Sequence, residues 1–155
     1  MRYTLIISIL AVCFISCNKD KYTTAPQISF KSFDPNQGSN HNTFSDQPVM
    51  VLEITDAEGD LGFINGHDTA RVYIKNMLTL KEDSIDFPDL AAARKSNFKA
   101  NIEVGLFSVM GGRNLPFSSR PYQDNLQFQV YVKDFAKNKS NVILTDKPFT
   151  FYTLP

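Results

Sequence analysis

Leu126-Gln-Phe-Gln-Val-Tyr-Val-Lys133 decides the fold class, because apolar and polar side chains alternate along its whole length. Successive side chains of an extended strand point to opposite faces, so this alternation predicts a half-buried strand. Segments on both sides of it alternate in the same way or are continuously apolar, and clusters of Gly, Pro, Asn and Asp separate them. We expect strands at residues 27–33, 48–55, 71–75, 101–109, 126–133, 141–145 and 149–152.

Six or seven strands with little helical signal predict an all-β fold, an antiparallel β-sandwich. One stretch breaks the pattern: Pro88-Asp-Leu-Ala-Ala-Ala-Arg-Lys95 has helix-forming residues behind a proline that suits a first helical turn. We therefore allow one short helical insert near residues 88–96. A closed barrel is the alternative architecture, but the uneven spacing of the strands favours two facing sheets.

Size and composition limit the possible functions. The chain has 155 residues, and its 16 basic and 16 acidic side chains give a formal net charge of zero. This length predicts one domain. A neutral chain lacks the basic excess of a nucleic-acid-binding protein, so we expect no nucleic-acid partner. Two cysteines are too few for a disulfide-rich scaffold or a Cys-based zinc cluster.

The N-terminus has the pattern of a secreted protein. Residues 5–15 are almost wholly apolar and follow Arg2. The run has about half of the roughly 20 residues that cross a bilayer, so it predicts a signal peptide and not a membrane span. The hydrophilic residues that come next, up to Pro26, have the composition of a linker.

The end of the apolar run, Phe14-Ile-Ser-Cys17, resembles a bacterial lipobox, which ends in a small residue and a cysteine. The resemblance implies cleavage between Ser16 and Cys17, a diacylglycerol thioether on Cys17, and acylation of the new amine. The chain then divides into a signal peptide (1–16), a lipidated tether (17–26) and a folded domain (27–155). An ordinary signal peptide with an incidental cysteine is the alternative.

The sharpest chemical motif is Thr55-Asp-Ala-Glu-Gly-Asp-Leu-Gly-Phe63, in which three carboxylates alternate with small residues. Ca²⁺ prefers several oxygen ligands on a backbone that can wrap around it. The glycine position and the lack of flanking helices exclude an EF-hand. No Lys or Arg occurs between Lys31 and Arg71, so the acidic side chains there need solvent or a cation to offset their repulsion.

A second oxygen-rich turn lies at Lys133-Asp-Phe-Ala-Lys-Asn-Lys-Ser-Asn141. In a sandwich of immunoglobulin-like topology, the loop after the second strand and the loop after the penultimate strand lie at the same end. We therefore expect Asp134 and Asn138 to lie near Asp56 and Asp60, where the two loops could form one cation site. The candidate Ca²⁺ ligands are Asp56, Glu58, Asp60, Asp134 and Asn138.

Two plainer interpretations of these loops stay open. Asp and Asn often bond the backbone of their own turn, and Gly supplies a positive φ there. In addition, Lys133, Lys137 and Lys139 surround Asp134 in the sequence, and they could neutralise the acidic side chains without a metal.

The lipobox, the Asp56–Gly62 loop and the segment 126–141 together resemble a group of small envelope lipoproteins of Bacteroidetes-type bacteria that carry one immunoglobulin-like domain. In that group the first loop commonly reads Asp-x-Asp/Glu-Gly-Asp-Ile/Leu-Gly, and the last turn reads Asp-x-Ala-x-Asn-x-Ser-Asn. The resemblance implies an immunoglobulin-like sandwich at the cell envelope, as an outer-membrane lipoprotein on either its periplasmic or its surface side. It implies no activity.

We expect a non-enzymatic protein, because the sequence offers no nucleophile with a base and an orienting group around it. Its expected work is interaction, as a binding module held at the membrane by the lipid on Cys17, with an envelope protein or a glycan as partner. The alternative function is a Ca²⁺- or glycan-binding module that uses the acidic loop 56–62 as its site.

Overall fold

The structure is a computed structural model that describes residues 22–62, 69–87 and 96–155. The described part is built from β-strands and two short 3₁₀ turns, η2 (Phe44–Asp46) and η4 (Phe117–Ser119). The strands are β1 (Gln27–Asp34), β2 (Gln37–Ser39), β3 (Val49–Asp56), β4 (Arg71–Asn76), β5 (Glu82–Asp86), β6 (Phe98–Gly105), β7 (Tyr122–Leu126), β8 (Phe128–Lys133), β9 (Ile143–Leu144) and β10 (Phe149–Thr153).

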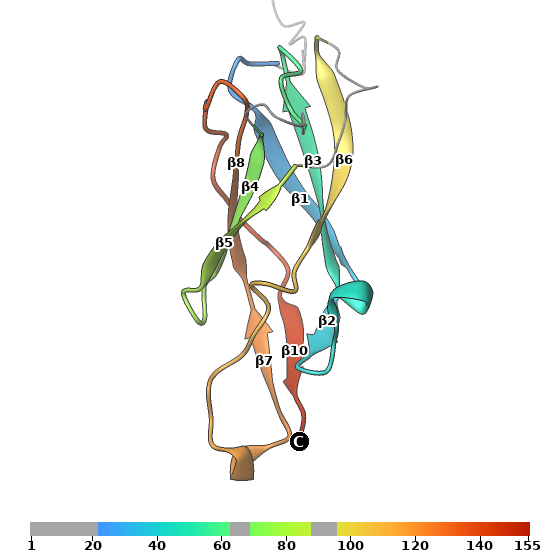
Figure 1. Cartoon of the computed structure of the whole chain (residues 1–155), viewed down its shortest axis with the longest axis vertical. Helices are drawn as coiled ribbons and strands as arrows, with labels where there is room; N and C mark the ends of the chain where they lie inside the picture. The colour runs from blue at the N-terminus through green and yellow to red at the C-terminus, as the bar shows by residue number, and fades with distance from the viewer. Residues whose placement is uncertain (1–21, 63–68, 88–95) are drawn as a thin grey trace, which may run out of the picture.

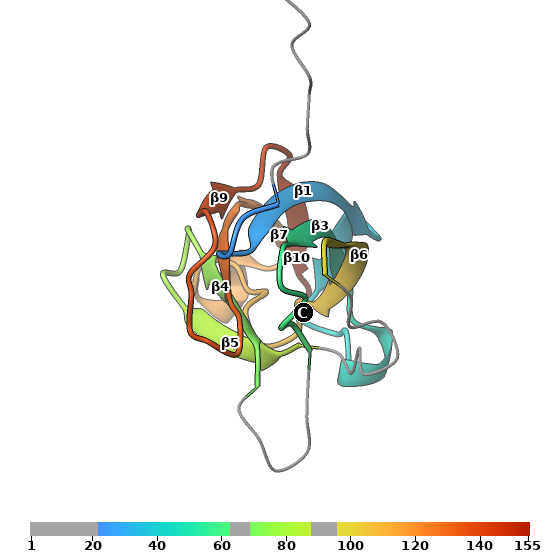
Figure 2. The same cartoon turned by 90° about the horizontal axis from the view of Figure 1, so that it is seen from above.

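The strands form an elongated sandwich (Figure 1). In its upper half the sheet β1-β3-β6 faces the sheet β5-β4-β8-β9, and in its lower half β2-β10-β7 forms a third sheet. All neighbouring strands are antiparallel except β2 and β10, which pair in parallel. The view from above shows the first two sheets wrapped around a common interior (Figure 2). The predicted antiparallel β-sandwich is confirmed, and its topology is compatible with an immunoglobulin-like domain.

The predicted strand at 126–133 is two strands. β7 pairs with β10 in the lower half, whereas β8 pairs with β4 and β9 in the upper half. The Thr145 hydroxyl accepts the Phe128 N–H, and the Phe128 carbonyl accepts the Thr145 N–H. These bonds lie where the paired strands pass from one sheet to the other. The strand predicted at 101–109 begins earlier, at Phe98, and ends at Gly105.

The core lies between the sheets and is formed mainly by apolar side chains. Met50, Leu52 and Ile54 of β3 are fully buried, as the alternation along that strand requires. Phe33, Phe128 and Phe149 meet edge to face, with ring centroids 5.3 to 6.2 Å apart, where the upper and lower halves join. Each such side chain contributes about 1.5–3 kcal/mol when it is fully buried.

The Asn141 side chain connects the two facing sheets along one side. Its Oδ1 accepts the Ile28 N–H at 2.8 Å, and its Nδ2 donates to the Ile28 carbonyl at 2.9 Å. One amide side chain thus imitates a backbone partner for β1, and it joins that strand to the segment that leads into β9.

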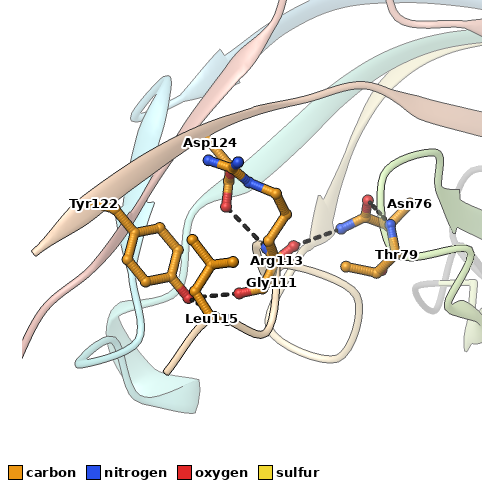
Figure 3. A network of polar contacts seen from close by, with 7 residues as sticks. All are labelled: Asn76, Thr79, Gly111, Arg113, Leu115, Tyr122 and Asp124. Atoms are coloured by element: carbon orange, nitrogen blue, oxygen red, sulfur yellow. Dashed lines mark hydrogen bonds and ion pairs between the residues drawn. The ribbon is translucent and has the colours of Figure 1, made fainter. Parts of the chain in front are cut away.

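A polar network packs the long connection between β6 and β7 against the sandwich (Figure 3). The Tyr122 hydroxyl donates to the Arg113 carbonyl at 2.5 Å, in the manner of the tyrosine corner of immunoglobulin-like sandwiches. Asn76 is fully buried and donates to the carbonyls of Val109 and Gly111. Asp124 binds the backbone N–H of Arg113 and its guanidinium.

Three predictions fall outside the described residues: the helical insert near 88–96, of which 88–95 are not described, the signal peptide and the lipobox. Within the described ranges, no helix has the length and apolar character needed to span a membrane.

Candidate metal centre

The loop after β3 folds around the Asp56 carboxylate. Asp56 is the last residue of β3 and is fully buried. Its Oδ2 accepts the N–H groups of Gly59, at 2.5 Å, and Asp60, at 3.3 Å. Gly59 has a φ of 68° and Gly62 a φ of 124°, values that glycine adopts without steric cost, and they let the chain turn back within this short segment.

The loop after β8 holds Asp134 in the same way. Asp134 is fully buried, and its two oxygens accept the Asn138 backbone N–H, at 2.7 Å, and the Asn138 side-chain N–H, at 2.9 Å. An isolated antiparallel β-bridge between the backbones of Lys133 and Lys139 closes the loop at its base. Asn138 therefore positions the Asp134 carboxylate.

The two loops meet at one end of the sandwich. The Phe135 N–H donates to the Asp60 carbonyl at 3.1 Å and joins them directly. One carboxylate oxygen from each of Asp56, Asp60 and Asp134 lies within 4.8 Å of the others. We call these three residues the carboxylate cluster. The Ala57 N–H donates to the Thr23 carbonyl, so the first described residues lie at this same end, which we call the N-terminal end.

Two buried oxygen atoms of the carboxylate cluster have no hydrogen-bond donor among the described residues. Asp56 Oδ1 and Asp60 Oδ1 are buried, and no described residue donates a hydrogen bond to either atom. Burial raises the pKa of Asp56 to about 6 against the opposing effect of the Gly59 N–H, and the charge of Asp60 adds to the increase. Burial also raises the pKa of Asp134, although its hydrogen bonds from Asn138 oppose the change.

Two of the lysines near the carboxylate cluster contact aromatic rings. The carboxylates of Glu53, Asp86 and Asp124 form ion pairs with Lys31, Lys99, Arg71 and Arg113. The Lys133 ammonium lies over the Tyr73 ring, 5.4 Å from its centroid, and the Lys139 ammonium lies 4.0 Å from the Tyr131 centroid.

The predicted ligands thus separate into three kinds. Asp56, Asp60 and Asp134 come together, Asn138 supports Asp134, and Glu58 is exposed and stands outside the carboxylate cluster. The three clustered carboxylates could hold a metal ion. The predicted lipidation site Cys17 and the cleavage site after Ser16 lie outside the described residues.

Sequence reasoning missed the bond from Phe135 to the Asp60 carbonyl, which sets the distance between the two loops. A backbone bond of this kind leaves no signal in residue identity. It also missed the pairing of lysines with Tyr73 and Tyr131, although the alternation along both strands places these side chains on one outer face.

Comparisons with known proteins add little. No protein-family model matches the chain, and no curated protein matches it. Among solved structures, a β-glucosidase from Kluyveromyces marxianus in complex with glucose is similar over 84% of this chain and 15% of that chain. The identity is 10% and the TM-score 0.30, so this likeness carries no argument about fold or function.

Proposed function

We propose that this protein is a lipid-anchored binding module of a bacterial outer membrane, and that the carboxylate cluster binds Ca²⁺. The observation that carries the calcium site is Asp56, a fully buried carboxylate with an oxygen that no described residue bonds. An uncompensated buried charge is strongly unfavourable, and the two nearest charged groups of its cluster are also carboxylates. A bound cation would convert this repulsion into attraction.

The geometry is compatible with Ca²⁺. Its oxygen ligands lie about 2.3–2.6 Å from the ion, so two ligands of one ion are at most about 5 Å apart. The 4.8 Å limit within the carboxylate cluster meets this condition. Hard carboxylate oxygens without His or Cys also favour Ca²⁺ over Zn²⁺.

The proposed role of the ion is structural. Asp56 ends a strand of the first sheet and Asp134 follows a strand of the second, so an ion between them would connect the two sheets. Both side chains are fully buried, a position that suits a structural ion better than contact with a substrate. We therefore propose binding and not catalysis as the function of the protein.

The lipid anchor rests on the lipobox at residues 14–17. Together with the bond between Thr23 and Ala57, it would place the calcium site close to the point where the tether leaves the domain. Replacing Cys17 with Ala should abolish labelling of the protein by radioactive fatty acid in its native host. Labelling that persists in the variant would contradict the assigned anchor.

The calcium site is tested on residues 18–155, which contain every described strand and core residue. An ion at about 100 times its Kd adds about 2.7 kcal/mol of stability, which raises the melting temperature of a domain of this size by about 10 °C. We expect this increase in CaCl₂ relative to EGTA, and its loss in Asp60→Asn. Asp146→Asn, at an exposed aspartate, is the matched control and should keep the increase.

The result that would overturn the calcium site is equally direct. It is an unchanged melting temperature and no heat of binding at millimolar Ca²⁺, measured on protein that was first treated with EGTA.

A further inference from the structure

The outer face of the sheet β5-β4-β8-β9 carries two stacked tyrosines at its centre. Tyr73 and Tyr131 are directly opposite each other in the β4–β8 ladder. Their ring centroids are 4.6 Å apart and their planes differ by 5°. The residues that flank each tyrosine in its strand are buried in the core, so both rings lie on the side away from it. No described residue forms a hydrogen bond with either hydroxyl group.

Lysine ammonium groups flank the tyrosine pair. Lys133 lies over Tyr73 and Lys139 lies over Tyr131. We call these four residues the basic aromatic face. Ammonium groups over aromatic rings keep their charge available to a ligand, whereas an ion pair with a carboxylate would neutralise it.

The neighbouring charges on this face are partly balanced. Arg71 binds Asp86 at 2.8 Å, and Lys75 lies opposite Glu82 in the β4–β5 ladder. The opposite outer face of the sandwich differs, because the Glu53 carboxylate there forms ion pairs with both Lys31, at 3.1 Å, and Lys99, at 3.7 Å. Lys31 and Lys99 are therefore paired with acid, while Lys133 and Lys139 lie against tyrosine rings.

We propose that the basic aromatic face binds a linear acidic polysaccharide, with the lysines contacting uronate carboxylates and the tyrosine hydroxyls contacting sugar hydroxyls. The tyrosine rings already cover each other and meet the lysines, so the face offers cations and hydroxyl groups and not open ring faces for a neutral sugar. The outer face of a sheet is open along its strands and accommodates an extended chain. This site uses none of the carboxylate cluster and does not depend on the calcium site.

An anionic membrane fits the arrangement less well. β4 and β8 run along the long axis of the molecule, so the basic aromatic face is one of its sides (Figure 1). Lys133 and Lys139 flank the loop at the N-terminal end, where the first described residues leave and where a bilayer that holds the tether would lie, so only this end of the face would meet a membrane.

The test uses residues 18–155 in EGTA, which removes calcium from both the protein and the polymer. Polygalacturonate oligosaccharides are titrated into the protein by calorimetry, with dextran as a neutral probe and phosphatidylglycerol vesicles as the membrane probe. We expect binding to polygalacturonate that weakens with added NaCl, and no binding to dextran or vesicles. Because EGTA is present throughout, failure of the calcium site would leave this result unchanged.

A matched pair of double variants locates the site. Lys133→Gln with Lys139→Gln should weaken the affinity for polygalacturonate about tenfold, a loss of about 1.4 kcal/mol. Lys31→Gln with Lys99→Gln removes the same charge from the opposite face and should leave the affinity within about twofold. Equal losses in both variants, equal binding of dextran, or binding of vesicles alone would overturn the proposal. Circular dichroism confirms that each variant is folded.

Discussion

The fold treats two buried aspartates, Asp124 in β7 and Asp56 at the end of β3, in opposite ways. Asp124 is 6% exposed, and the backbone N–H and the guanidinium of Arg113 bind its two oxygens (Figure 3). Asp56 is fully buried, yet one of its oxygens has no donor among the described residues and its neighbours in the carboxylate cluster are also acids.

The difference teaches where a charge partner must come from. A buried carboxylate costs several kcal/mol unless it is paired, and at Asp124 the chain supplies its own cation. At the carboxylate cluster the chain supplies N–H donors to Asp56 and Asp134, while Asp56 Oδ1 and Asp60 Oδ1 have no donor among the described residues. The first arrangement is complete by itself, whereas a cation from solution would complete the second.

The largest expected effect is on stability, from breaking the ion pair between Asp124 and Arg113. Arg113→Ala should lower the free energy of unfolding by about 3 kcal/mol, because it leaves a buried carboxylate without its cation. Urea unfolding in EGTA and in CaCl₂ should give the same loss. Arg71→Ala removes an exposed pair with Asp86 and should cost less than about 1 kcal/mol. If Arg113→Ala lowers the free energy of unfolding no more than this control does, water solvates the Asp124 carboxylate. Asp124 would then not depend on an ion pair within the chain, and the contrast with Asp56 would be wrong.

The next effect is the pH dependence of the calcium-free protein. Because the pKa of Asp56 is raised to about 6, the folded state binds a proton more tightly than the unfolded state between the two pKa values. The free energy of unfolding should therefore fall as the pH rises from about 4 to 6, by about 2 kcal/mol. Asp134 contributes in the same direction.

Urea unfolding in EGTA from pH 5 to 6.5 should detect about 1 kcal/mol of this fall, and in this interval Asp46, Glu53 and Asp83, whose pKa values are lowered, stay ionised. Calcium should remove it, because the ion binds the deprotonated carboxylates. A stability that rises with pH across this interval in EGTA would contradict the prediction.

Asp56→Asn is expected to raise the free energy of unfolding of the calcium-free protein, by a smaller amount than the effects above. In EGTA the variant should be more stable at pH 7 by about 1 kcal/mol, because it removes a buried charge and its N–H₂ can donate to the neighbouring carboxylates. The same variant should lose its thermal response to Ca²⁺. A destabilised variant in EGTA would show that Asp56 already has a cationic partner in the calcium-free protein.

The smallest effect is expected at Glu58, the exposed member of the same loop. Glu58→Gln should change the free energy of unfolding by less than about 0.5 kcal/mol and the calcium affinity by less than about threefold, as for a distant surface charge. Isothermal titration with Ca²⁺ measures the affinity. A tenfold loss would place Glu58 among the ligands and would enlarge the site beyond the carboxylate cluster.

The sequence predicted β1 and β8 from their alternation, which burial on one face sets, and β3 from its nearly continuous apolar run. It also placed Asp56 and Asp134 at the same end, since the topology of a sandwich determines which loops are neighbours. It did not predict β5, a charged edge strand, or the three-residue β2, because neither segment has an apolar face to read. Both are defined by pairing, β2 with the distant β10 and β5 with its neighbour β4.

The division of the segment 126–133 into two strands could not be read from alternation either. Leu126 and Phe128 both point into the core, so the period of two continues unbroken through Gln127. The break is set by the partner strands, where the Thr145 hydroxyl takes the N–H of Phe128 in place of a backbone carbonyl. Within the candidate site, the sequence did not show that Glu58 lies outside the carboxylate cluster. The alternation of acidic and small residues in a turn does not determine which carboxylates face inward.

The two hydrogen bonds between the Asn141 side chain and the Ile28 backbone have a mechanical consequence. A pull on the N-terminal segment acts along β1, which lies lengthwise against β3, so the hydrogen bonds of that ladder are loaded together in shear and not opened one at a time. Asn141 ties the start of β1 to the second sheet as well. Tension on a tether would therefore be shared by both layers of the sandwich from its first strand onward.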